Sequence, residues 1–170
     1  MQASIHRNLA QARIYQAMPL ADAIRREIET CGARRVFVTT TRSLSAGRVV
    51  ADAVAALGDR FVGKFDALPA HSPRESVIEG ARRVREAGAD RILAIGGGSV
   101  IDSTKVMLQA LWYDIDDVDA LSGIAGSGHA GGRHPDDWQR DPQSLRMFAL
   151  STTLSAAEFS HRAGVTDTST

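Results

Sequence analysis

Short apolar runs rich in β-branched residues alternate along this chain with segments of helical periodicity, and this alternation limits the fold more than any other feature. The runs lie at residues 35–40, 61–65, 91–95 and 146–150. Their length and composition are typical of strands, and the run at 91–95 is the clearest of them. The sequence therefore predicts strands at these four places.

Between the runs, apolar residues recur at the spacing of one helix face. Pro19 stands where the first helix can begin, Gly58 closes the second and Pro73 opens the third. A mostly apolar helix is expected over residues 100–112. Because each helix is long enough to connect parallel strands, the pattern predicts an α/β fold, a parallel sheet covered by helices. A further edge strand is expected at residues 12–16.

The chain has 170 residues with 20 basic and 20 acidic side chains, which fits one domain over residues 1–170. The balance leaves no global basic field, so neither nucleic acid nor an anionic membrane is an expected partner. No apolar run approaches the ~20 residues of a membrane span, and the amino terminus lacks the profile of a signal peptide. The single cysteine, Cys31, excludes an internal disulfide. We expect a cytoplasmic protein.

The regular alternation fails between about residues 121 and 145. This stretch contains five of the fifteen glycines, two of the five prolines and a mixed run of charges. Such a composition predicts a long glycine-rich loop. After the last predicted strand, residues 154–170 hold a short helical turn and polar residues, and they do not look like the close of a domain.

The most informative stretch is Ile95–Ser99, where a buried strand runs into three glycines and then a helix. Such a turn lets a phosphate approach the backbone and lie on the unsatisfied amides at the positive end of the helix dipole. The turn also follows the carboxyl end of a parallel strand, where ligands of open sheets bind. Ser99 and Asp102 have the spacing of a reciprocal helix cap.

A tight turn with a good cap and no ligand explains the same residues. The usual dinucleotide fingerprint is not met, because its third glycine position falls on Ile101. A phosphate loop of the Gly-Lys-Ser/Thr kind is also excluded, since no such triplet follows at the required spacing. Spacing alone leaves both interpretations open, a phosphate site and a structural turn.

Gly96–Lys105, which reads GGGSVIDSTK, resembles the GGGSxxDxxK segment of the iron-containing alcohol dehydrogenase family. Further along, Ser151–Glu158 resembles that family's second coenzyme segment, a Thr-Thr pair followed by small residues and a glutamate. Residues 35–40 correspond to the strand that carries the coenzyme-selecting position, and His71–Pro73 is similar to a turn of the maleylacetate reductase branch. The resemblance extends over nearly the whole chain.

This resemblance implies a Rossmann-like, NAD(P)-binding domain like the amino-terminal domain of dehydroquinate synthase, with helices on both faces of a parallel sheet. The complete enzyme would transfer hydride between NAD(P)H and a carbonyl or alcohol substrate. The glycines and the serine after them are expected to hold the pyrophosphate, with the Thr-Thr pair lining the coenzyme cleft. The implied coenzyme-binding residues are Thr40, Gly97, Gly98, Ser99, Asp102, Thr152, Thr153 and Ser155.

The coenzyme preference implied by the resemblance depends on the end of the first predicted strand. Thr40 or Thr41 stands where NAD-selective members have an aspartate, and Arg42 follows. A carboxylate there would pair with the ribose hydroxyls and repel a 2′-phosphate. Its absence beside an arginine favours NADP slightly, or the use of both coenzymes.

No catalytic or metal-binding residue is assigned within the chain. The family usually carries a divalent metal, iron or zinc, on one aspartate and three histidines of a helical carboxy-terminal domain, whose positions come after residue 170. None of the five histidines here has the i, i+4 spacing of a helical metal site. We therefore expect the chain alone to lack turnover, and a carboxy-terminal domain or a partner chain to supply the metal site.

Two other expectations concern assembly. The chain could be a non-catalytic nucleotide-binding subunit or scaffold that pairs with a partner chain, and a homo-oligomer also fits. The substrate is not predicted, because the resemblance implies that most residues shaping its pocket belong to the carboxy-terminal domain.

Overall fold

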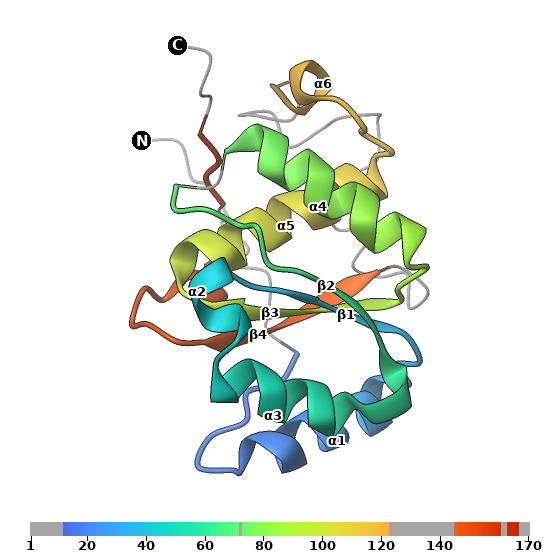
Figure 1. The fold of residues 1–170 in the computed structure, drawn as a ribbon, viewed down its shortest axis with the longest axis vertical. Helices are drawn as coiled ribbons and strands as arrows, with labels where there is room; N and C mark the ends of the chain where they lie inside the picture. Colours follow the sequence, from blue (N-terminus) through green and yellow to red (C-terminus); the bar gives the residue numbers. More distant parts are fainter. Residues whose placement is uncertain (1–11, 72, 123–144, 161–162, 167–170) are drawn as a thin grey trace, which may run out of the picture.

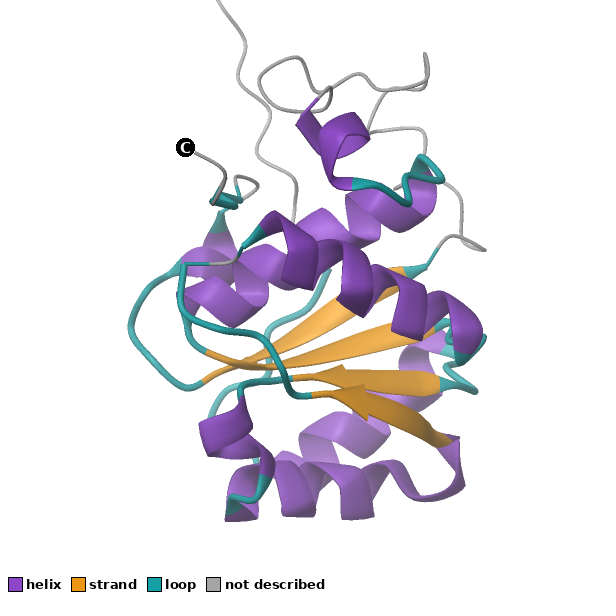
Figure 2. Ribbon diagram, turned by 45° about the horizontal axis from the view of Figure 1, so that its top comes forward, coloured by secondary structure: helices purple, strands orange, loops and turns teal. Residues whose placement is uncertain are grey.

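The computed structural model describes residues 12–71, 73–122, 145–160 and 163–166. At its centre lies a sheet of four parallel strands with helices on both faces (Figure 1, Figure 2). The order across the sheet is β2-β1-β3-β4. The strand bounds are β1 Val36–Thr39, β2 Phe61–Phe65, β3 Arg91–Gly96 and β4 Arg146–Ser151. The predicted α/β fold, with a parallel sheet and helices on both faces, is confirmed.

Helices α1 (Leu20–Cys31) and α3 (Arg48–Leu57) pack side by side on one face of the sheet (Figure 1). The one-turn helix α2 (Arg42–Ser45) precedes α3, and a 3-10 turn at Gly58–Arg60 leads from α3 into β2. The apolar sides of α1 and α3 share one core cluster with side chains from β1 and β3. Burial of these apolar faces is what holds the two helices to the sheet.

The other face carries α4 (Arg74–Glu86) and α5 (Gly98–Trp112), which pack against each other, while the short α6 (Val118–Ser122) contacts α4. Core residues of α4 and α5 meet those of β3 in a second cluster. A 3-10 turn at Ala157–Phe159 (η2) follows β4 and contacts α5.

The two central strands are buried and the two outer strands keep partial exposure. β1 is buried at all its positions and β3 at every position after Arg91, whereas β2 and β4 are mostly half-buried. This difference follows from the strand order, because among the described strands only β1 and β3 have neighbours on both sides. The carboxyl ends of the central strands are thereby fixed in place from both sides.

The strand order contains one reversal. From β1 the chain passes through α3 to β2 on one side, then crosses through α4 to β3 on the other side and continues through α5 to β4. The connections change direction, and the helices change face, between β1 and β3 (Figure 1). Ligands of open parallel sheets bind outside the carboxyl ends of the strands at such a reversal. The glycine turn follows one of these two strand ends.

Residues 12–16, predicted as an edge strand, form no regular strand. Arg13 and Tyr15 instead hydrogen-bond to the Glu27 carboxylate on α1, at 2.7 to 3.0 Å. The prediction was wrong because these side chains attach the segment to a helix, a contact that alternation of residue types does not reveal.

The predicted glycine-rich loop at about 121–145 lies mostly outside the described residues, and α6 occupies its first positions. Within the described ranges, every helix is too short or too polar to cross a membrane.

Candidate functional site

The glycine turn lies where β3 ends and α5 begins. Gly97 is the N-cap of α5, and its carbonyl accepts hydrogen bonds from the amides of Val100 and Ile101, both at 3.1 Å. A Cβ on Gly97 would lie 2.8 Å from the hydroxyl oxygen of Thr153, closer than real Cβ atoms come to such an atom. Glycine at this position therefore lets the loop after β4 lie directly against the turn.

Several contacts hold the loop after β4 in this place. The amide of Thr152 donates to the carbonyl of Gly96 at 3.0 Å, which continues the pairing of β3 with β4. Farther along, Ser155 lies beside Gly98, since a Cβ on that glycine would be 3.2 Å from the Ser155 side chain. The amide of Ala157 donates to the Ser155 hydroxyl at 3.4 Å. The two sequence segments that the resemblance connects to the coenzyme thus meet at one edge of the sheet.

Asp102 and Lys105 add a charged pair to the first half of α5. The Lys105 ammonium lies 3.2 Å from an Asp102 carboxylate oxygen and donates to the carbonyl of Ala157 at 2.6 Å. Lys105 therefore links α5 to the loop after β4 and balances the carboxylate nearest the turn. The position of Lys105 in the sequence does not show whether its side chain makes such contacts or faces solvent.

The predicted reciprocal cap between Ser99 and Asp102 is not formed. The N-cap of α5 is Gly97, which has no side chain to cap the helix. Ser99 therefore already lies in the first turn, and Asp102 pairs with Lys105 instead. The prediction was wrong because the helix begins right after the extended Gly97, earlier than the spacing of polar residues suggests.

Thr40 follows β1 at the other side of the reversal. Its side chain is fully buried, and its hydroxyl donates to the carbonyl of Ile95 at 2.8 Å, which ties the ends of β1 and β3 together. Thr41 accepts a hydrogen bond from the amide of Leu44 at 3.3 Å and so caps α2. Arg42 is exposed. At this strand end, then, the surface is formed by Arg42 and not by the Thr40 hydroxyl.

A charged group at the end of β2 is not evident from the motifs of the sequence. We name Ser45, Lys64 and Asp66 the β2-end cluster. The Ser45 hydroxyl donates to Asp66 Oδ2 at 2.5 Å, and the Lys64 ammonium contacts that hydroxyl and, at 3.3 Å, the same carboxylate oxygen. The hydrogen bond from Ser45 and the charge of Lys64 lower the pKa of Asp66. One signal existed: Lys64 and Asp66 are two positions apart at the end of a predicted strand, and side chains at that spacing share a face.

His71 and Pro73 lie just before α4. His71 is exposed and has a left-handed φ of 65°, which residues other than glycine rarely adopt. Its carbonyl accepts a hydrogen bond from the Thr166 hydroxyl at 2.6 Å, and the amide of Arg74 donates to the Thr166 carbonyl at 3.2 Å. Thr166, after η2, thus holds the backbone of His71 and of Arg74.

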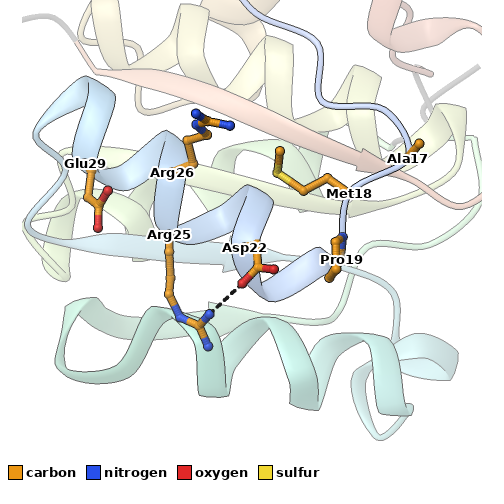
Figure 3. A pocket seen from close by; sticks show the side chains of 7 residues that line it. All are labelled: Ala17, Met18, Pro19, Asp22, Arg25, Arg26 and Glu29. Carbon is orange, nitrogen blue, oxygen red and sulfur yellow. Dashed lines mark hydrogen bonds and ion pairs between the residues drawn. The ribbon is translucent and has the colours of Figure 1, made fainter.

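Two surface hollows lie beside α1, and neither includes the glycine turn. A groove of about 630 Å³ follows the outer side of β4, between residues 12–16, α1 and α5, and is mostly apolar. A shallower hollow lies beside the first turns of α1 (Figure 3), where Arg25 and Asp22 pair at 2.9 Å. Exposed pairs of this spacing are typical of a solvated helix surface.

No three or more His, Cys, Asp or Glu side chains lie close enough to bind a metal ion together, in the part of the chain that the structure describes. These residues therefore do not fit a metal centre. The edge around the turn instead offers backbone amides at a helix start, hydroxyl groups and an exposed guanidinium, which are groups that bind phosphates.

Comparisons with known proteins agree with one another. The sequence model described as "Iron-containing alcohol dehydrogenase" matches residues 12–170. Dehydrogenase FUM7 of Gibberella moniliformis is 30% identical over 156 residues, which are 91% of this chain and 37% of that protein. The crystal structure of maleylacetate reductase from a Rhizobium species has a TM-score of 0.55 at 29% identity, over 64% of this chain and 30% of that one.

Sulfoacetaldehyde reductase of Bifidobacterium kashiwanohense, solved in complex with NAD+, has a TM-score of 0.66. Its identity of 19% over 87% of this chain and 39% of that one reflects a shared fold alone. The chain thus spans well under half the length of each of these relatives.

Proposed function

Because the chain belongs to the iron-containing alcohol dehydrogenase family, a family of oxidoreductases, we propose that it is a coenzyme-binding domain which holds NAD or NADP at the carboxyl edge of its sheet. In the complete enzyme this binding serves hydride transfer between NAD(P)H and a carbonyl or alcohol carbon. The nicotinamide ring supplies the hydride when the coenzyme is bound, and the protein supplies binding and orientation.

The observation that carries this proposal is the start of α5 at the reversal of strand order. Three glycines precede or begin the helix, and its N-cap, Gly97, has no side chain that could cap it. A pyrophosphate can therefore approach the backbone and interact with the amides and the dipole of the helix start. The absence of a Cβ on Gly97 and Gly98 lets Thr153 and Ser155 lie against the turn, which brings their hydroxyls to the helix start.

Each residue of the site has a separate task in this proposal. Gly97, Gly98 and Ser99 bind the pyrophosphate through the helix start, and the hydroxyls of Thr153 and Ser155, which lie against the turn, donate to phosphate oxygens. Thr152 positions this loop through its hydrogen bond to Gly96. Asp102 does not repel the phosphates because Lys105 balances its charge at 3.2 Å.

The proposal assigns no metal-dependent step to the residues that the structure describes. The residues that the structure describes bring no three ligands together, so the iron named in the family description is held by a carboxy-terminal domain or a partner chain. The described residues bind and orient the coenzyme only, and we expect no dehydrogenase turnover from the 170-residue chain.

Calorimetric titration of the folded chain with NADPH and NADH tests the proposal. We expect binding of both coenzymes, weakened about tenfold or more by Gly98→Val, because the added side chain crowds Ser155 and displaces the loop that this proposal places on the phosphates. Gly164→Val is the matched control, since Gly164 has open space around its Cβ position. Absence of binding at millimolar coenzyme, or an equal effect of the two substitutions, would contradict the proposal.

A further inference from the structure

We propose that the β2-end cluster (Ser45, Lys64 and Asp66) determines which coenzyme the chain prefers. In this proposal, Lys64 balances the negative charge of a carboxylate that would lie next to the adenosine ribose. This inference rests on the proposed function, because it requires a coenzyme whose pyrophosphate lies on the glycine turn. It adds residues at the end of β2 to those at the end of β1, where the sequence placed the coenzyme preference.

The position of the cluster follows from the strand order. A coenzyme bound on the turn after β3 extends its adenosine half over the neighbouring end of β1, and β2 is the next strand along the same edge. The amide of Thr40 donates to the carbonyl of Phe65 at 3.0 Å, so the ends of β1 and β2 remain paired up to the last residue before Asp66. Asp66 therefore stands one strand beyond the end of β1, at the edge that the ribose would face.

A carboxylate at this edge has a known chemical consequence. In dinucleotide-binding sheets, an acidic residue near the adenosine ribose accepts hydrogen bonds from its hydroxyls and repels a 2′-phosphate. A free Asp66 would thus favour NADH over NADPH, even though Thr40 and Thr41 carry no charge. The Asp66 side chain is 41% exposed, so its charge can still act on a bound coenzyme.

The contacts within the cluster remove most of this effect. Ser45 donates to one oxygen of Asp66, and the Lys64 ammonium, 32% exposed, lies 3.3 Å from the same oxygen. The lowered pKa of Asp66 agrees with a carboxylate that stays ionised and paired. With Asp66 balanced by Lys64, the exposed guanidinium of Arg42 on α2, which forms no ion pair within the described residues, attracts a 2′-phosphate.

A purely structural role is the competing explanation. Ser45 is the last residue of the one-turn helix α2, so its bond to Asp66 also fixes that helix to the end of β2. A tether alone would change the affinity for both coenzymes equally, whereas a charge effect changes their ratio. The ratio of the two dissociation constants therefore separates the two roles.

The test compares NADPH and NADH binding to the folded chain and to charge variants, by calorimetry at fixed ionic strength. Lys64→Gln is expected to weaken NADPH relative to NADH by about fivefold, because it exposes the charge of Asp66 to the 2′-phosphate. Lys64→Arg should retain the ratio of the parent chain. The double variant Lys64→Gln/Asp66→Asn should restore it. Arg83→Gln, which breaks an ion pair with Glu79 on α4, controls for the loss of one positive charge.

The outcomes separate the inference from the function on which it rests. An unchanged ratio in Lys64→Gln, with both coenzymes still bound, overturns the inference and leaves the proposed function intact. An equal loss of both coenzymes in Lys64→Gln and Lys64→Arg shows a tether of α2 only and also overturns it. If the folded parent chain binds neither coenzyme, the proposed function fails and the inference fails with it.

Discussion

Two buried threonines connect the sheet to α5 through their hydroxyls. Thr39 Oγ1 and Thr104 Oγ1 lie 2.7 Å apart, and Thr104 Oγ1 donates to the carbonyl of Val100 at 2.8 Å. Because the Thr104 proton is used in that bond, Thr39 must be the donor to Thr104. The pair lies just below the glycine turn and fixes the direction in which α5 leaves the sheet.

This assignment predicts unequal effects of two similar substitutions. Thr104→Val leaves the Thr39 hydroxyl buried without an acceptor, and we expect the free energy of unfolding to fall by about 2 kcal/mol. Thr39→Val leaves Thr104 its bond to Val100 and should cost about 1 kcal/mol. Urea titrations of both variants and of the double variant measure these values. Equal single costs, or a double variant that costs the full sum, would argue against the assigned donor.

At the scale of residues, the sequence predicts which side-chain types lie near the site better than it predicts where each side chain points. The resemblance identifies Thr40 as a coenzyme contact, but both faces of a central parallel strand are covered, and the structure uses the Thr40 hydroxyl to bind Ile95. Alternation could not show this, because neither side of β1 reaches solvent. For Thr153 and Ser155 the position follows from the motif, since a loop after a strand stays at the edge where that strand ends.

Helix α4 approaches α5 across Gly80. A Cβ on Gly80 would collide with the end of the Met107 side chain and lie 3.1 Å from Phe65 Cδ1. Met107 is itself fully buried, so it has little space into which it can move. The glycine therefore sets the distance between the two helices.

Gly80→Ala is expected to destabilise the chain although alanine is the better helix former. The gain in helix propensity, about 1 kcal/mol, is outweighed by overpacking, which costs about 1–3 kcal/mol in a tight core. Adding Met107→Leu, which shortens the obstructing side chain, should recover part of the loss. Thermal and urea unfolding measure both changes, with Gly164→Ala as the control at an open position. A more stable Gly80→Ala variant would mean that the helices separate at little cost.

The attachment of residues 12–16 to α1 depends on the charge of Glu27. Burial alone would raise the pKa of Glu27, but the hydrogen bonds from Arg13 and Tyr15 outweigh it and lower the pKa below its ordinary value of 4.5. A group with a depressed pKa in the folded state contributes stability above its ordinary pKa, and this contribution is lost as the pH falls through the folded-state value. The contacts of Glu27 should therefore weaken in acid.

Glu27→Gln tests this dependence. At pH 7 we expect the free energy of unfolding to fall by about 1 kcal/mol, since the variant loses the ionic hydrogen bonds to Arg13. The difference between parent and variant should shrink as the pH falls below 4.5. Chemical denaturation at a series of pH values measures it. A difference that stays constant down to pH ~3 would contradict a stabilising role of the Glu27 charge.

At the scale of elements, the length of each helix or strand decided whether the sequence could predict it. The four strands and the four long helices were expected from periodicity, and their positions are confirmed within a few residues. The one-turn α2 and the short α6 are too brief to show a helical period. The start of α5 was misjudged because it depends on the backbone of Gly97, and polar spacing favours a different cap.

At the scale of the whole molecule, the order of the strands was not predictable from the pattern. Alternating strands and helices require a parallel sheet, but they do not say on which side of β1 each later strand is added. That choice creates the reversal between β1 and β3, and with it the relation of the glycine turn to Thr40 and to the β2-end cluster. The motif places the turn on a helix start, whereas the reversal decides which strand ends surround it.

Coenzyme binding at this reversal should stabilise the whole fold, because the site is assembled from segments that unfolding separates. At a concentration ten times the dissociation constant, NADPH is expected to raise the free energy of unfolding by about 1.4 kcal/mol, since the unfolded chain has no such site. For a chain of 170 residues this corresponds to about 4 °C in the midpoint of thermal unfolding. Hydrogen exchange should slow most at the amides of residues 96–99 and 152–157, and α1 should show only the smaller protection that follows from global stability. A midpoint that does not move when calorimetry reports saturation would mean that the coenzyme binds the unfolded chain equally well. Protection centred instead on the groove along the outer side of β4 would place the ligand there, away from the glycine turn.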